Sequence, residues 1–216
     1  MKKNPKDNVI LLAIVTLAII LRLWHINWGL PEVYEEATPY SVAWKMWQWG
    51  QTGIDPNPHF FNYPALTFYL NFLLQGVYYV FGHMIGWFPT VQAYHQANFG
   101  NSSSWILISR MLSVVFDIGT VTLLFFLSRV YVGSIAGFVA ALLAAINPLL
   151  IKNAQIVNVD TPLTFFIVAA LYCFDQLYNE EEWRWYILAG ACIGLAASSK
   201  YNGAFLLPVF FAAHLF

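Results

Sequence analysis

Long apolar runs, separated by short polar stretches, make up most of the chain. The clearest runs cover residues 9–24, 105–128, 134–150, 162–178 and 183–198, and a last run begins at residue 203. A helix that crosses a bilayer needs roughly 17–25 mostly apolar residues. The pattern therefore predicts an all-α fold, a polytopic transmembrane helix bundle with about six spans.

The stretch between the first two clear runs has a different character. Residues 25–63 are rich in prolines, carboxylates and tryptophans. Tryptophan beside polar residues is typical of the headgroup level of a membrane, where the ring is half buried and its N–H stays hydrated. We therefore predict juxtamembrane helices and turns that lie along the membrane surface in this first outer loop.

Residues 64–82 permit two interpretations. The segment is long enough to cross a bilayer, but it contains Asn71, Gln75 and Gly76 and several tyrosines. We place it on the outer surface, because the turns at 150–161 and 199–203 then face the same side as the first loop. The chain's rare charges in these regions meet at one leaflet in that arrangement, and charges at a membrane are costly unless they pair or act.

The composition supports a membrane protein and excludes one class of partner. Hydrophobic residues make up 59% of the 216 positions and charged residues only 10%, against about 25% charged in a soluble domain. A formal net charge of −1 leaves no basic surface for nucleic acid. Cys173 and Cys192 lie inside apolar runs, and we interpret them as small core residues.

The ends of the chain suggest its orientation and extent. Lys2, Lys3 and Lys6 precede the first run, which favours a cytoplasmic N-terminus, and no small-residue cleavage site follows that run. We expect a multi-pass protein of the plasma (inner) membrane with an extracytoplasmic active site. The last run reaches Phe216 without a polar exit, so we interpret residues 1–216 as an N-terminal transmembrane domain that is incomplete at its C-terminus.

Four ionisable residues at span ends are the main candidates for chemistry. Glu35 and Glu36 are adjacent carboxylates among aromatic residues and could supply a general base and its partner, or form an acidic turn. Asp160 precedes Thr161-Pro162 and an apolar run, which is also typical of a helix N-cap. Lys200 lies in a turn among small residues, where it could bind a phosphate or simply reach the interface.

Two further features permit a structural or a functional interpretation. Arg110 and Asp117 are seven residues apart and share a helix face, which favours an intramembrane pair over a substrate role. Residues 56–64, which include His59, Asn62 and Tyr63, form a rigid aromatic stretch that could line a sugar pocket or form an interfacial turn. No zinc spacing or phosphate-binding glycine loop occurs. Adjacent acids permit a divalent cation, but no spacing requires a metal or another cofactor.

The order of these landmarks resembles one family. Several stretches resemble, in this order, those of the polytopic C-type glycosyltransferases. They are the run from Arg22 to Pro31 followed by Glu35-Glu36-Ala37, residues 58–66, Ser109-Arg110-Met111-Leu112-Ser113, Asn147-Pro148, residues 158–162 and residues 199–203. That superfamily includes the protein O-mannosyltransferases, the aminoarabinose transferases and the RgtA/B/C/D-like enzymes. Glu35 stands where the family usually has Asp.

The resemblance implies transfer of a sugar from a polyprenyl-phosphate donor to a lipid, glycan or protein acceptor on the outer (periplasmic) face, with inversion. It implies catalytic roles for Glu35, Glu36 and Asp160. The expected substrate-binding residues are Lys200, Arg110, His59, Asn62, Tyr63 and Tyr201. The family also has a juxtamembrane helix at the position of residues 64–82.

Two other functions fit the composition. A transporter or flippase of lipid-linked intermediates would place its charges and broken helices near mid-bilayer, often in two related repeats. Here most ionisable residues lie at span ends, and the two halves show no repeat. In a non-catalytic membrane scaffold, the carboxylates would serve only as caps and loop charges.

Overall fold

The computed structural model describes residues 5–30, 36–49, 53–100, 102–180 and 182–215. It is 80% helical, and the described residues form no strand, which confirms the all-α prediction. In chain order the helices are α1 (Pro5–Leu23), α2 (Ala37–Met46), α3 (Leu66–Met84), α4 (Val91–Gly100), α5 (Ser102–Val132), α6 (Ser134–Ile146), α7 (Pro148–Ala154), α8 (Asp160–Glu180), α9 (Trp183–Ser199), the 3₁₀ turn η1 (Tyr201–Phe205) and α10 (Leu206–Leu215).

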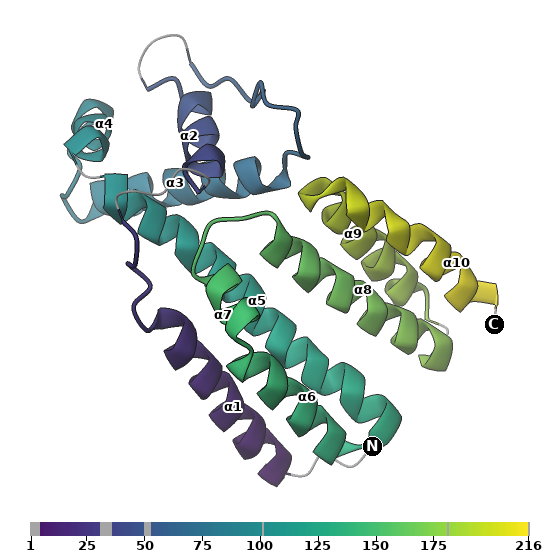
Figure 1. Ribbon diagram of the computed structural model, residues 1–216. Helices are drawn as coiled ribbons and strands as arrows, with labels where there is room; N and C mark the ends of the chain where they lie inside the picture. Colours follow the sequence, from purple (N-terminus) through teal and green to yellow (C-terminus); the bar gives the residue numbers. More distant parts are fainter. Residues whose placement is uncertain (1–4, 31–35, 50–52, 101, 181, 216) are drawn as a thin grey trace.

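The long helix α5 lies at the centre of the bundle, with α1 and α6 on one side and α8 on the other (Figure 1). The α1–α5–α6 core is made of small and aromatic side chains, among them Ala18, Phe125 and Ala141. A second core joins α8, α9 and α10 around Phe166, Phe174 and Ile193. The bundle thus has two apolar cores.

The glycines of α6 and α9 differ in role. A Cβ at Gly137 would lie 2.8 Å from the Phe125 carbonyl oxygen, so α6 approaches α5 closely, as small-residue patterns allow. Gly190 and Gly194 have open space beside them within 4 Å. Within the described part of the chain, these two glycines therefore mediate no close helix contact.

Only some of the expected spans meet the length and hydropathy required for a crossing. Among the described residues, α5 and α8 are long and apolar enough, and the bent pair α6 and α7 would make a third crossing. The axis bends by 60° at Asn147-Pro148, so the single span expected over 134–150 is broken. The side-chain oxygen of Asn147 accepts from the N–H groups of Leu149 and Leu150 and starts α7. Helix α1 carries three charged residues and α9 has 17 residues, so the count of six stays a prediction.

Helix α3 lies across one end of the bundle rather than along it (Figure 1). Its amides Asn71 and Gln75 face inward and are buried, whereas Leu73, Val77 and Met84 are exposed. The Gln75 side chain donates to the Tyr40 carbonyl at 3.1 Å and so ties α3 to α2. Gln75 therefore holds α3 to α2, whereas the Asn71 amide donates to the Thr67 carbonyl within α3 at 2.8 Å. The exposed side of α3 is apolar, and a juxtamembrane position for this helix stays a prediction.

The helices at the α3 end of the bundle share an aromatic core. Tyr40 and Trp44 of α2, Tyr94 of α4 and Trp105 of α5 are buried together, with ring centroids of Tyr94 and Trp105 4.7 Å apart. Burial raises the pKa of the Tyr94 hydroxyl above its usual range, so it stays protonated and donates to the Gln75 carbonyl at 2.7 Å. This core fixes α2, α3 and α4 over the end of α5.

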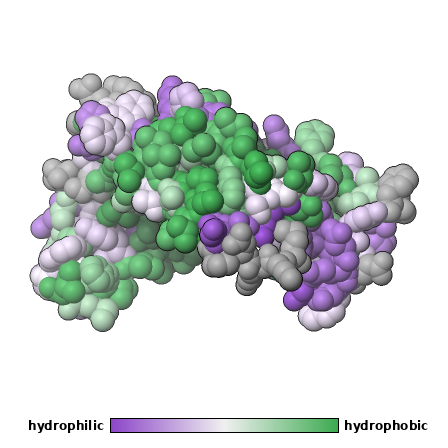
Figure 2. Space-filling model, turned by 90° about the horizontal axis from the view of Figure 1, so that it is seen from below, coloured by the Kyte–Doolittle hydropathy of each residue, from purple (hydrophilic) through white to green (hydrophobic). Residues whose placement is uncertain are grey.

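Much of the molecular surface is apolar. Seen from below, hydrophobic side chains cover the middle and the lower left of the molecule, and the largest group of hydrophilic ones lies at the lower right (Figure 2). Exposed residues such as Val9, Ile135 and Ile187 lie on bundle helices, where a soluble protein would place polar groups. A surface of this kind is stable against lipid.

A buried ion pair joins the first helix to the central one. The Arg22 side chain of α1 is fully buried and donates to Asp117 of α5. The same guanidinium donates to the carbonyls of Ala145 (2.8 Å) and Ala144 (3.2 Å) in the last turn of α6, where a cation is favoured by the helix dipole. Arg22 therefore connects three helices.

We expect Arg22→Met to destabilise the bundle by about 3–5 kcal/mol, because it leaves the buried Asp117 carboxylate unpaired. The double variant Arg22→Met/Asp117→Leu should recover most of that loss, since an apolar pair of similar volume replaces both charges. Thermal unfolding of the detergent-solubilised protein measures both effects. A double variant no more stable than Arg22→Met would contradict this account.

Candidate active site

The most buried part of the candidate site is an ion pair between Glu36 and Arg110. Glu36 immediately precedes α2, and its carboxylate accepts from Arg110 Nε at 2.8 Å and Nη2 at 2.7 Å. One carboxylate oxygen also accepts from the backbone N–H of Val157 at 3.0 Å. This bidentate geometry is the strongest kind of charge-assisted hydrogen bond, and it fixes the 155–159 loop against the start of α2.

Arg110 extends this connection to the segment after α1. Its Nη1 donates to the carbonyls of Ile26 and, at 2.9 Å, of Trp28. The Arg110 side chain is fully buried and that of Glu36 is 6% exposed. Three regions far apart in sequence, residues 26–36, α5 and the loop before α8, therefore meet at one guanidinium–carboxylate pair.

Asp160 and Lys200 form an exposed ion pair at the same end of the bundle. Lys200 Nζ lies 2.7 Å from Asp160 Oδ1. The Asp160 side chain is 53% exposed and the Lys200 side chain 39%, so both charges are accessible to a ligand. Asp160 begins α8 and Lys200 follows α9, which brings the two predicted site residues together from elements 40 positions apart.

Asn158, rather than Asp160, caps α8. The Asn158 Oδ1 accepts from the Thr161 backbone N–H at 2.8 Å and from its hydroxyl at 3.0 Å. Its Nδ2 donates to the carbonyls of Asn153 (2.7 Å) and Ile156 (3.2 Å). The N-cap interpretation of Asp160 is therefore wrong, because a neighbouring amide takes that position and leaves the Asp160 carboxylate directed to Lys200.

An aromatic groove of about 450 Å³ lies beside this exposed pair. One wall is the proline-rich 56–65 stretch together with the start of α3. The other wall is η1. Tyr201 lines the groove directly after Lys200, and the lining also includes Pro56, Asn57, Pro58, Phe60, Phe61, Tyr63, Pro64, Ala65 and Tyr69. Two predicted substrate-binding residues, Tyr63 and Tyr201, thus share one hollow. Burial raises the pKa of the Tyr63 hydroxyl, which keeps that hydroxyl a hydrogen-bond donor.

His59 and Asn62 are placed differently from Tyr63. His59 is exposed, adopts a φ of +49° and contacts Asp55 through Nε2 at 2.9 Å. The Asn57 backbone N–H, which donates to Asp55, and the nearby His59 ring lower the pKa of the Asp55 carboxyl. Asn62 is exposed and, like His59, is absent from the groove lining. Both belong to the turn that shapes the groove.

The predicted pairing of Arg110 with Asp117 is wrong. Arg110 pairs with Glu36 and Asp117 pairs with Arg22. Seven residues of α-helix separate two side-chain bases by about 10 Å, which is too far for direct contact, so each group takes a partner from another segment.

The candidate site also depends on polar residues that were not predicted from the sequence to belong to it. Asn158 and Gln155 organise the loop before α8, and Gln155 Nε2 donates to the Trp24 carbonyl at 2.8 Å and the Arg22 carbonyl at 3.1 Å. The visible signal was a run of amides, Asn153, Gln155 and Asn158, between two apolar segments. Glu35 lies outside the described residues. Within the described ranges, no three His, Cys, Asp or Glu side chains gather as a ligand set.

The fold and this site define a class: an integral membrane protein with charged and aromatic side chains gathered at one end of a helix bundle. The family model of dolichyl-phosphate-mannose-protein mannosyltransferases matches residues 88–216, which is more than half of the chain. The chain belongs to this family.

A curated relative agrees with the family assignment. The chain is 29% identical over 118 residues, 54% of its length, to the Bacillus subtilis (strain 168) protein named "Putative mannosyltransferase YycA". The matched region spans 17% of that relative's length. No solved structure matches. Family and relative together point to a membrane glycosyltransferase of the mannosyltransferase type.

We expect Asn158→Ala to lower stability by about 1–2 kcal/mol, because it removes the α8 cap and two further hydrogen bonds. Asp160→Ala removes only an exposed ion pair, which is worth about 0.2–1 kcal/mol. Thermal unfolding of the two variants side by side checks the order. If Asp160→Ala is the more damaging change, Asp160 and not Asn158 caps the helix.

Proposed function

We propose that this protein transfers a sugar from a polyprenyl-phosphate-linked donor to an acceptor at the outer face of the membrane, with the site at the α3 end of the bundle. The observation that carries the proposal is the exposed Lys200–Asp160 pair beside the aromatic groove. A lipid-linked donor keeps its chain in the bilayer, so its reacting end must be met where the bundle reaches the membrane surface. Family membership supports this type of reaction.

Lys200 is the residue proposed to bind the donor phosphate. As the acceptor hydroxyl attacks the anomeric carbon, the bond from that carbon to the phosphate oxygen breaks, and polyprenyl phosphate leaves as an anion. A leaving group of this kind needs a cation rather than a proton donor. The Lys200 ammonium is accessible and can contact the phosphate while Asp160 still faces the site.

Glu35 is the residue proposed to take the proton of the acceptor hydroxyl. It directly precedes Glu36, whose carboxylate is held by Arg110 and by the Val157 N–H. Glu36 and Arg110 then act as positioning residues, because both are buried and satisfied by each other. Attack opposite the leaving phosphate implies inversion at the anomeric carbon.

The aromatic groove is proposed to hold a sugar ring. Tyr63 and Tyr201 offer flat ring faces and hydroxyl groups, a combination that suits a polyol with one apolar face. The groove adjoins Lys200 through its neighbour Tyr201, so a sugar placed there would lie near the phosphate position. The prolines of the 56–64 stretch keep the wall rigid.

We expect Lys200→Met, Asp160→Asn and Glu35→Gln each to slow sugar transfer at least tenfold. Loss of one electrostatic contact is worth about 10²–10³ in rate, and loss of a general base about 10²–10⁴. The measurement is transfer of labelled sugar from polyprenyl-phosphate donors by membranes that contain the protein. Lys152→Met is the matched control, since it removes an exposed lysine of α7 outside the proposed site.

The variants should reach the membrane in parental amounts, because all three altered side chains are exposed or lie in the outer loop. Near-parental transfer by both Lys200→Met and Glu35→Gln would refute the assignment of the phosphate-binding cation and the base. An equal loss in Lys152→Met would show that the assay reports general surface charge instead.

A further inference from the structure

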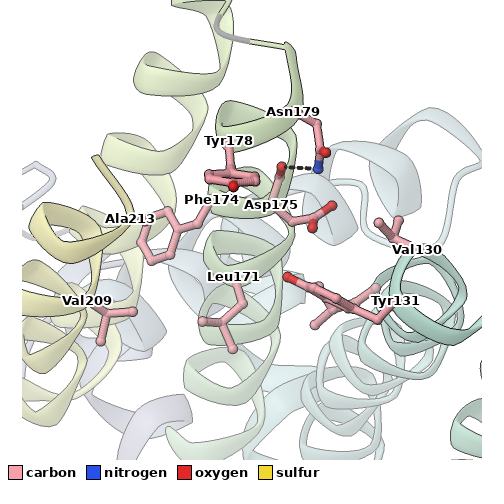
Figure 3. Close-up of a pocket in the computed structure, with 10 residues that line it drawn as sticks. Val130, Tyr131, Leu171, Phe174, Asp175, Tyr178, Asn179, Val209 and Ala213 are labelled. Atoms are coloured by element: carbon pink, nitrogen blue, oxygen red, sulfur yellow. Dashed lines mark hydrogen bonds between the residues drawn. The ribbon is translucent and has the colours of Figure 1, made fainter. Parts of the chain in front are cut away.

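A second hollow lies at the other end of the bundle, far along α5 and α8 from the candidate active site. It has a volume of about 660 Å³. Its floor is one face of α8, formed by Leu171, Phe174, Asp175 and Tyr178 at helical spacing. Helices α5 and α10 form the two walls (Figure 3). We refer to this hollow as the α8 groove.

The α8 groove has an apolar part and a polar end. Leu171 and Phe174 on the floor and Val209 on the α10 wall are apolar, whereas Asp175, Tyr178 and Asn179 lie toward the end of α8. The Tyr131 side chain of α5 points its hydroxyl toward the Asp175 carboxylate (Figure 3). An occupant should therefore be amphipathic, with its polar part at the end of the helix.

Asp175 differs from the other buried carboxylates of the described residues. Asp7, Glu36 and Asp117 each pair with an arginine. Asp175 is 7% exposed and forms no ion pair within the described ranges. Its carboxylate has neutral partners only, the Gln176 amide, from which it accepts at 3.0 Å, and the Tyr131 hydroxyl. The occupant should thus supply a cation.

The length of the groove identifies the kind of occupant. Its floor covers residues 171–179 of α8, which rise about 12 Å along the axis. A transmembrane helix needs the full hydrocarbon thickness of about 30 Å, whereas acyl chains need half of it. Nearer the start of α8 the floor is closed, because Phe165 and Phe166 pack on Phe116 of α5. A groove one leaflet deep fits lipid.

A second apolar hollow supports a ligand with two chains. It lies between α5 and α6, is about 620 Å³ in volume and includes Tyr131 in its lining, as the α8 groove does. Tyr131 is 70% exposed and stands between the two hollows. One acyl chain on each side of this ring would bring the headgroup to the level of Asp175 and Tyr178.

We propose that the α8 groove is a binding site for a phospholipid with a primary-amine headgroup, whose ammonium pairs with Asp175. The Tyr178 hydroxyl can donate to the phosphate of the same headgroup. This site belongs to the leaflet opposite the candidate active site and is separate from the donor site. It makes the stability of the bundle depend on the lipid.

The test uses the protein purified in detergent, with phosphatidylethanolamine, phosphatidylcholine or phosphatidylglycerol of the same acyl chains added at defined ratios. Native mass spectrometry and thermal shift measure binding. We expect phosphatidylethanolamine to bind at least about tenfold more tightly than the other two, as a charge-assisted hydrogen bond implies. Asp175→Asn should remove that preference, and Glu182→Gln, which alters an exposed carboxylate near the same end, should keep it.

A second variant makes the test independent of charge. Ala213→Trp adds bulk to the α10 wall of the groove and should reduce lipid retention with Asp175 intact. Equal binding of the three lipids by the parent, or an unchanged preference in Asp175→Asn, would overturn the proposal. So would a dimer whose α8 groove cross-links to a second copy and excludes lipid.

Discussion

The arrangement of this protein depends on the cost of placing charge in an apolar environment. An isolated charge at mid-membrane costs at least about 2.5–3.5 kcal/mol, and the bundle meets this cost by pairing. Arg22 with Asp117 and Arg110 with Glu36 each join segments that the apolar cores alone would leave free to slide. Hydrophobic contact in lipid is non-directional, so these pairs define the register of α1, α2 and α5.

The same constraint explains why the candidate site lies at helix ends. Asp160 and Lys200 stay exposed because each belongs to a turn between helices rather than to a helix interior. The buried Glu36–Arg110 pair brings the loop before α8 to the start of α2, and Asn158 then leaves the Asp160 carboxylate free to face outward. The buried ion pairs fix the positions of the helices, and the exposed Asp160–Lys200 pair beside them is accessible to a ligand.

The helices and the convergence of Asp160 with Lys200 could be predicted from the sequence, because apolar runs and turn residues are local signals. The partner of each buried charge could not be predicted. Arg22 and Asp117 are 95 positions apart, and nothing in either neighbourhood identifies the other. The cap of α8 was assigned two residues too late, since Asp and Asn cap equally well and only the loop path decides between them. In α3 the amides Asn71 and Gln75 face the protein and not the headgroups, so the surface location inferred from them stays a prediction.

The Arg22–Asp117 pair has a consequence for biosynthesis. Helix α1 leaves the ribosome long before α5, so Arg22 enters the membrane while its carboxylate partner does not yet exist. Because Arg22 is near the end of α1, its long side chain can reach the interface during this interval. Only when α5 is inserted can Asp117 draw the guanidinium inward, where it also reaches the last carbonyls of α6. The contact that Arg22 makes with α5 therefore forms only after both helices have been synthesised, so this pair belongs to a late step of assembly.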